Sequence, residues 1–397
     1  MTQYIYVMKR LVFVLVMLLP VFFLQCTAGG ENRIEYITPE NVSIEDVFFT
    51  RFAEQIYNAD STMKAKATVF DAGVNEEQWS GNFKKLTLWG ESKEDVVSTY
   101  NAAKLLFLKN PRIDYADIAE RALYNGVLAA VDSSRMGNKE WKKAAQAVLD
   151  APATAYAMRG SDLWVNLYFR NRAYIKNDSL DMVILQNTSA PWVSDVFFSL
   201  KFNNANPHMR LHLRLPAWLR GQVTPTGEYA YKPMREFYQV VLNGKRLTLR
   251  ASADGYITID RVWQSDDVIR FSMQTAVRRI RPSKQSGGTF AVQEGPILYA
   301  CESKGEKVYF DSEAAFGNKY DKEVLHTNML TTSTYSSRKP NGDTPWSGIL
   351  LPYYVSFGRN TANPPPRCPK APPTNAECSP RFSHCFTSNT RRLSLPT

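Results

Sequence analysis

In the stretch from 96 to 149, apolar residues recur every three or four positions, which is the spacing of one buried helix face. The pattern predicts helices over Val96–Leu108, Tyr115–Ala130 and Lys139–Leu149. Asn110-Pro111 interrupts it between the first two, because proline lacks the amide proton that a continuing helix needs. We therefore expect an antiparallel helix pair followed by one further helix.

From position 163 onward the apolar period falls to two, which is the period of a strand with one buried face. Leu163–Phe169 and Met209–Leu215 show this alternation. Asn243-Gly244 lies between two apolar runs and is a strong hairpin signal, and Asp254-Gly255 opens a further strand over Tyr256–Ile259. Many short strands separated by turn residues indicate a β-sandwich rather than a parallel sheet.

The remaining stretches give weaker patterns. We expect a strand within Ile34–Ile44, a helix within Val47–Ala67 and a loop over Phe70–Gly90, which is rich in Gly, Asn and Trp. Arg281–Phe357 reads as a second β unit.

The N-terminal stretch has the pattern of a secretory signal. Lys9 and Arg10 precede an apolar run over Leu11–Leu24, which is shorter than the roughly 20 residues of a spanning helix. Cys26 follows this run, either as the acylated cysteine of a bacterial lipoprotein or beside a small-residue cleavage site. We expect an exported protein, in the periplasm or held at the cell surface by a lipid anchor on Cys26.

Size and charge narrow the class of protein. A chain of 397 residues is long enough for two or three domains. The net charge of +10 is spread along the chain, and its densest basic cluster, over 278–284, is short. We therefore expect no nucleic-acid partner, because no basic motif interleaved with aromatic residues is present. The oligomeric state stays open.

Cysteines and histidines are too few and too scattered for a recognisable metal-binding spacing. His208 and His212 are four positions apart, but they fall on a predicted strand and not on one face of a helix, so we interpret them as structural. After Asn360 the chain turns rich in Pro, Ser, Thr and Arg, which predicts a disordered tail or an out-of-frame reading.

Several motifs, in their order and spacing, resemble glycoside hydrolase family 127 and its relatives, the bacterial β-L-arabinofuranosidases. The resemblance covers Gly73–Arg359. Its motifs are Thr99–Asn101, Glu120–Asn125, Leu215–Trp218, Val241–Lys245, Gly255–Trp263, Phe290–Tyr299 and Leu351–Tyr354.

The resemblance implies an (α/α) barrel followed by two β-sandwich domains. Only a few helices fit before Trp164, so we expect a mixed α and β fold in which a remnant of the barrel precedes two antiparallel sandwiches. The expected parts are a signal peptide over 1–26, a helical remnant over 34–160, a middle sandwich over 163–280, a C-terminal sandwich over 281–359 and the tail over 360–397.

The resemblance also implies an unusual chemistry, with a cysteine thiolate nucleophile held on zinc and a glutamate as acid/base. The family's Glu-x-Cys ligand motif falls on Asp95 and Val97, and no cysteine lies between Asn125 and Trp164. Val97 cannot bind zinc, so we expect no cofactor in this chain, although intact relatives hold zinc. Glu77, behind Gly73, is the candidate acid/base, and Glu77 and Asp95 are the two catalytic candidates.

The same carboxylates also suit a plain structural role, in a loop and at a helix start where negative charge is favourable. Three hypotheses follow. The first is a β-L-arabinofuranosidase-like hydrolase for plant-derived arabinose-containing glycans, with impaired catalysis. The second is an exported, non-catalytic carbohydrate-binding or scaffolding β-sandwich protein, and the third is a truncated gene product. In the first two the partner is a plant-type oligosaccharide or polysaccharide.

Overall fold

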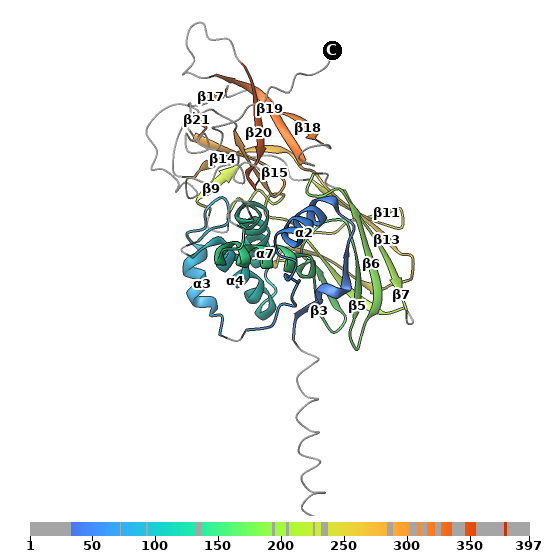
Figure 1. Cartoon of the computed structure of the whole chain (residues 1–397). Helices are drawn as coiled ribbons and strands as arrows, with labels where there is room; N and C mark the ends of the chain where they lie inside the picture. The colour runs from blue at the N-terminus through green and yellow to red at the C-terminus, as the bar shows by residue number, and fades with distance from the viewer. Residues whose placement is uncertain are drawn as a thin grey trace, which may run out of the picture.

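The protein has a mixed α and β architecture with few helices and several sheets that are almost entirely antiparallel (Figure 1). The computed structural model describes residues 33–71, 73–92, 94–131, 136–192, 195–203, 206–224, 227–231, 237–283, 289–301, 309–310, 316–321, 327–335, 346–354 and 377–378. The predicted signal, Cys26 and nearly all of the tail therefore lie outside the described residues. Within the described part, no helix combines the length and the apolar character needed to cross a membrane.

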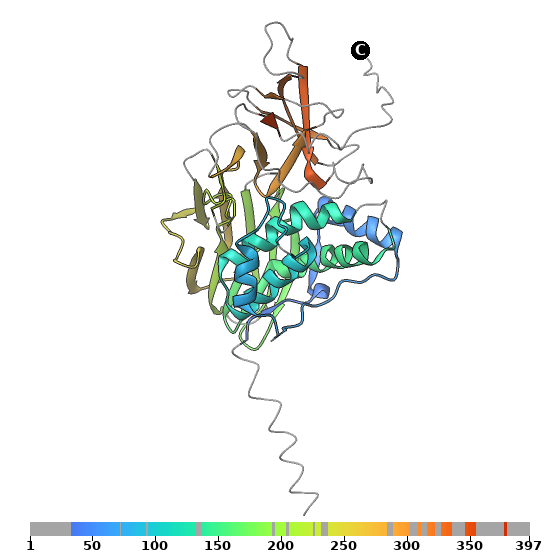
Figure 2. The ribbon, with the colours of Figure 1, turned by 90° about the vertical axis from the view of Figure 1, so that its left-hand side faces the viewer.

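The helices lie together on one side of the molecule (Figure 2). They are α2 (Val47–Ala59), α3 (Glu76–Phe83), α4 (Val96–Lys109), α5 (Ile113–Ala122), α6 (Leu128–Ala130) and α7 (Lys139–Asp150), with a π-helical segment η2 (Leu123–Val127) between α5 and α6. Short 3₁₀ turns η1 (Pro39–Asn41) and η4 (Ala151–Ala155) complete the set. The predicted helix pair and the third helix are confirmed, and α4 packs along α5.

Two expectations for the N-terminal helices need correction. The helix expected within 47–67 ends at Ala59. The loop expected over Phe70–Gly90 is wrong in part, since α3 lies inside it. The side chain of Asn75 accepts hydrogen bonds from the amides of Glu77 and Gln78, and two acidic residues occupy the first turn. This capping starts a helix that the Gly-rich composition obscures.

A five-stranded sheet lies next to the helices. Its order is β1 (Glu35–Tyr36), β3 (Tyr156–Arg159), β4 (Asp162–Val165), β8 (His208–Arg214) and β12 (Tyr256–Val262). Only the β4–β8 pair is parallel. The predicted strands around Leu163, Met209 and Tyr256 are confirmed.

A seven-stranded sheet lies behind the first. Its order is β11 (Lys245–Leu247), β10 (Tyr238–Leu242), β13 (Val268–Met273), β7 (Asp195–Phe202), β6 (Asp181–Thr188), β5 (Asn171–Lys176) and β2 (Val42–Ile44). The predicted hairpin is confirmed, because Leu242 faces Lys245 across the turn. Asn243 and Gly244 both have positive φ, at 49° and 79°, as a two-residue turn that follows the twist of its strands requires.

A third sheet stands beyond the helices and the first two sheets (Figure 1). Its strands are β9 (Tyr229–Tyr231), β14 (Val277–Pro282), β15 (Thr289–Glu294), β16 (Ile297–Cys301), β17 (Tyr309–Phe310), β18 (Gly317–Asp321), β19 (Thr327–Tyr335), β20 (Trp346–Pro352) and β21 (Glu377–Cys378). β21, from the predicted tail, runs parallel to β15.

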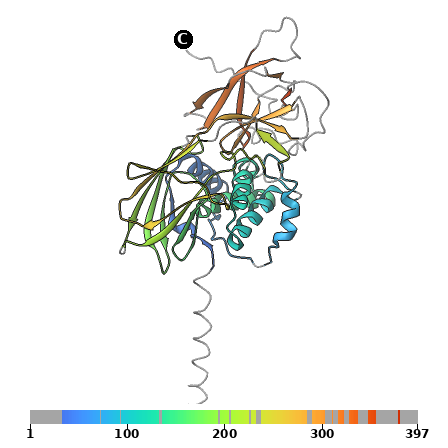
Figure 3. The same cartoon turned by 180° about the vertical axis from the view of Figure 1, so that it is seen from behind.

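The five-stranded sheet is buried on both faces. Leu211 and Leu213 of β8 share the large core cluster with Phe198 of β7 and Phe271 of β13, so the two sheets form a sandwich. Trp164 and Tyr256, which alternate with core-facing neighbours, pack with residues of α4 and α5 in a second cluster. The layers are therefore helices, five-stranded sheet and seven-stranded sheet, as the view from behind shows (Figure 3). The predicted antiparallel sheets are confirmed.

Candidate functional site

Glu77 lies exposed in the first turn of α3. Its neighbour Glu76 makes the contacts to the rest of the helical layer, since it accepts a hydrogen bond from the Tyr115 hydroxyl and lies 3.5 Å from Arg112. Burial and the hydrogen bond to Glu76 raise the pKa of Tyr115 well above its ordinary value. Glu77 thus lies outside the protein interior, where a catalytic acid is usually found, and its catalytic role stays a prediction.

Asp95 is the N-cap residue of α4. Its Oδ1 accepts hydrogen bonds from the amides of Val97 at 2.9 Å and Ser98 at 3.0 Å, and its Oδ2 accepts one from the Ser98 hydroxyl at 2.7 Å. Partial burial acts to raise the pKa of Asp95, but the hydrogen bonds from Ser98 and Val97 outweigh it and lower the pKa. The structural interpretation of Asp95 as a helix-start carboxylate is confirmed.

The residues at the predicted ligand positions do not fit a zinc–thiolate site. Val97 is 8% exposed and lies in the hydrophobic core, and both oxygens of Asp95 are engaged by the helix start. The sequence has no cysteine between Cys26 and Cys301 to supply a thiolate to this region. Among the described residues, no three His, Cys, Asp or Glu side chains lie close enough to hold a metal ion.

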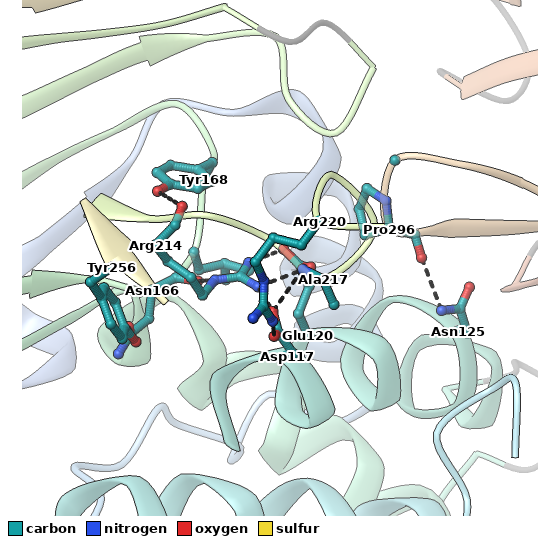
Figure 4. A network of polar contacts seen from close by, with 12 residues as sticks. Asp117, Glu120, Asn125, Asn166, Tyr168, Arg214, Ala217, Arg220, Tyr256 and Pro296 are labelled. Atoms are coloured by element: carbon teal, nitrogen blue, oxygen red, sulfur yellow. Dashed lines mark hydrogen bonds and ion pairs between the residues drawn. The ribbon is translucent and has the colours of Figure 1, made fainter. Parts of the chain in front are cut away.

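The most prominent polar cluster lies where α5 meets the end of β8 (Figure 4). The guanidinium of Arg214, which has no solvent exposure, donates to Asp117 Oδ1 at 2.6 Å, to Glu120 and to the Asn166 carbonyl at 2.7 Å. Arg220 also donates to Asp117. Burial acts to lower the pKa of Arg214, but the carboxylates of Glu120 and Asp117 raise it, so the arginine stays charged. We call these four ionic residues the junction cluster: Asp117, Glu120, Arg214 and Arg220.

The junction cluster suits a structural role better than acid/base catalysis. Its two carboxylates are balanced by two guanidinium groups, and Asp117 also accepts a hydrogen bond from the Ala217 amide at 3.0 Å. A glycosidase needs one carboxyl group that is free to give up a proton and a second that is free to act as base or nucleophile. Here both carboxylates are already hydrogen-bonded to buried arginine.

The same helix continues the junction toward the third sheet. Arg121 donates to the Leu88 carbonyl at 2.8 Å and to Gln293 Oε1 at 3.4 Å. Asn125, in η2, donates to the Pro296 carbonyl at 3.0 Å and accepts from the Leu298 amide at 2.8 Å. The motifs over Glu120–Asn125, Leu215–Trp218 and Phe290–Tyr299 therefore meet in space and join the helices to both β units.

A small pocket opens beside the junction cluster. Its empty space, open solvent included, is about 400 Å³, and its polar lining includes Asp114, Asp117, Arg121, Trp218 and Gln222. The buried indole N–H of Trp218 points at no hydrogen-bond acceptor among the described residues. Trp218 is 8% exposed and Trp263 is fully buried, so both are core residues.

His212 lies on β8, so its predicted placement on a strand is confirmed. Its ring lies 2.9 Å from both Asp162 Oδ1 and Thr258 Oγ1 and stacks on Trp164 at 4.7 Å. Burial lowers the pKa of His212, although Asp162 opposes this. The ring thus links β8 to its neighbours β4 and β12, which supports the structural interpretation.

The junction cluster was not predicted from the sequence. A signal was present, because Arg210, His212 and Arg214 alternate with the apolar core residues of β8 and so face the helices. Asp117 and Glu120, three positions apart on α5, share one helix face. The pairing of these two faces depends on the packing of distant segments, which no local pattern reveals.

Comparison with known proteins agrees with this architecture. Residues 162–275 match the family described as Beta-L-arabinofuranosidase, GH127 middle domain. The non-reducing end beta-L-arabinofuranosidase of Bifidobacterium longum subsp. longum is 22% identical over 254 residues. That alignment takes in 54% of this chain and 36% of the relative, so the chain spans only about a third of the curated protein that it matches.

Two solved structures share the fold. A GH127 beta-arabinofuranosidase superposes with a TM-score of 0.63 at 21% identity, over 80% of this chain and 58% of that one. A GH127 beta-L-arabinofuranosidase from Geobacillus stearothermophilus T6 superposes with a TM-score of 0.56 at 16% identity. The superposition covers 80% of this chain and 59% of that one. The chain thus has the fold of part of a glycoside hydrolase. Its residues 162–275, from β4 to β13, are similar in sequence to the GH127 middle domain, so the chain resembles GH127 proteins in both sequence and fold.

Proposed function

We propose that this GH127-like protein acts on plant-derived arabinose-containing glycans and that its own hydrolytic chemistry is impaired. The observation that carries the proposal is the state of the predicted ligand positions. Val97 is a buried hydrocarbon side chain, and Asp95 is the cap of α4. The activity for which these relatives are named supplies the substrate class, which is a β-L-arabinofuranoside.

The helices α4 to α7 are, in this proposal, the part of the relatives' catalytic barrel that this chain retains. The superposition on the GH127 beta-arabinofuranosidase covers 80% of this chain, a larger share than the β strands make up. This coverage supports the proposal that the helices belong to the barrel. The proposed divisions stay at 34–160, 163–280 and 281–359. The proposed location is outside the cytoplasm, with a lipid anchor at Cys26, on the strength of the signal pattern.

A carbohydrate-binding role without hydrolysis is the second candidate. The hydrogen bonds of the junction cluster and of Asn125 hold the helices against both β units, which favours this candidate. The strands are then held in place by residues that have no part in catalysis. In both candidates the partner is a saccharide. The first is a hydrolase with impaired catalysis, and the second is a binding protein without a catalytic role.

Zinc content and product release test whether the hydrolytic chemistry of this chain is impaired. The full chain is dialysed against zinc and then against buffer, and bound metal is measured by elemental analysis beside the Bifidobacterium relative. The same samples are incubated with a β-L-arabinofuranosyl disaccharide, and free L-arabinose is quantified. We expect no retained zinc and no arabinose from this chain. Retained zinc at one ion per chain together with arabinose release would show an intact enzyme.

A further inference from the structure

The outer face of the seven-stranded sheet is turned away from the helices. The five-stranded sheet lies between the seven-stranded sheet and the helices. In Figures 1 and 3 the seven-stranded sheet lies on the side of the molecule opposite the helical layer. Alternate residues of β5, β6, β7 and β13 are buried, and those between them form the outer face.

A row of outer-face side chains that includes an aromatic ring and two arginines runs from β7 to the edge strand β11. Arg270 of β13 pairs across the sheet with Phe197 of β7 on one side and with Val241 of β10 on the other. Val241 in turn faces Arg246 of β11. Phe197 is 39% exposed, and the Arg270 guanidinium lies 5.6 Å from its ring centroid. Adjacent strands are about 4.8 Å apart, so these side chains form one continuous row.

The outer face carries an excess of positive charge. Its strands present five cations and two carboxylates, which are Arg172, Lys176, Lys201, Arg246 and Arg270 against Asp181 and Asp195. Glu45, the residue after β2, adds a third carboxylate and lies 3.6 Å from Arg172. Asp181 pairs with Lys176 at 3.2 Å and Asp195 with Arg270 at 2.7 Å. Within the described part of the chain, Lys201 and Arg246 form no ion pair.

We propose that this face binds a polysaccharide that carries carboxylates, such as a polyuronate. The sheet presents Arg246 and Arg270 two strands apart for carboxylates of the polysaccharide, and the exposed Phe197 ring beside Arg270 offers an apolar surface for a sugar face. The inference rests on the proposed function only for the choice of a saccharide, since the charge and the ring are properties of this chain. This binding face is distinct from the helical layer, where a glycosidic bond would be cleaved.

The test is a binding titration of the full chain with polygalacturonate, at 20 mM and at 500 mM salt, beside a neutral arabinan of similar length. The variant Lys201→Gln with Arg246→Gln removes two cations from the face. The control Lys84→Gln with Lys139→Gln removes two exposed cations from the helical side, so the net charge of the two variants is equal. Phe197→Ser removes the ring at constant charge.

We expect polygalacturonate to bind at low salt and to weaken at high salt. The face variant should lose about tenfold in affinity and the control less than about twofold. Phe197→Ser should weaken binding at both salt concentrations. Absence of binding by the parent chain, equal losses in both double variants, or equally tight binding of double-stranded DNA at the same residues would each overturn the proposal. Hydrolysis of arabinofuranosides, which tests the proposed function, is measured separately.

Discussion

Asp117 on α5 and Arg214 at the end of β8 lie 97 positions apart in the sequence, yet Arg214 Nη1 donates a hydrogen bond to Asp117 Oδ1 at 2.6 Å. Arg214 is fully buried. The pair joins the helical layer to the sandwich. Because one carboxylate serves two arginines and a backbone amide, the junction depends on Asp117 more than on any exposed ion pair around it.

Asp117→Asn should destabilise the protein strongly. It removes the charge that balances buried arginine, and breaking one partner of a buried pair costs about 3–5 kcal/mol. The measurement is urea unfolding followed by tryptophan fluorescence. Asp114→Asn, on the same helix, breaks the exposed pair with Arg112 and should cost less than about 1 kcal/mol. Similar small losses in both variants would contradict the central role of Asp117.

Asn125→Leu should loosen the contact between η2 and the turn from β15 to β16. The change removes hydrogen bonds to Pro296, Leu298 and Arg121 at nearly constant volume, and each buried group left without a partner costs about 1–3 kcal/mol. Hydrogen exchange is the measurement, with faster exchange expected at the Leu298 amide. Asn187→Leu, on the exposed face of β6, is the control. Unchanged exchange at Leu298 would argue against this contact.

Lys104 should make stability rise with pH. The residue is 4% exposed, its ammonium lies 4.6 Å from the Tyr100 ring centroid, and burial lowers its pKa to about 8 although Asp150 opposes this. Between about pH 8 and the unfolded value near 10.4 the unfolded chain binds more protons than the folded one, so unfolding becomes harder as pH rises.

Lys104→Met should therefore stabilise the protein at pH 7, by up to about 3 kcal/mol, and should flatten the rise in stability above pH 8. Urea midpoints at pH 7, 8 and 9.5 give the comparison with the parent chain. A parallel rise in both proteins would show that another group causes it.

Asp95 should act as a cap and not as a catalyst. Asp95→Ala should cost about 1–2 kcal/mol, whereas Asp95→Ser should keep most of the stability, because serine is also a good N-cap. The lowered pKa of Asp95 means that its contribution is present above its ordinary pKa and is lost as pH falls through the lowered one. Thermal unfolding at pH 7 and pH 3 tests this, and an acid dependence equal in Asp95→Ser would refute it.

The sequence pattern predicted the elements whose signal is local. The helix pair, the Asn243-Gly244 hairpin and the alternating strands each depend on nearby residues, and all are confirmed. Helix α3 was missed because its start rests on the side chain of Asn75 rather than on apolar periodicity. The junction cluster was missed because it needs Asp117 and Arg214 from segments that come together only in the folded chain.

The most direct measurement is turnover of a chromogenic β-L-arabinofuranoside by the full chain, beside Glu77→Gln and the Bifidobacterium relative as positive control. We expect the parent chain and Glu77→Gln to give the same rate as a blank without protein, because the predicted ligand positions hold a buried valine and a helix cap. Turnover by the parent chain that is lost in Glu77→Gln would contradict impaired catalysis and would make Glu77 a catalytic residue.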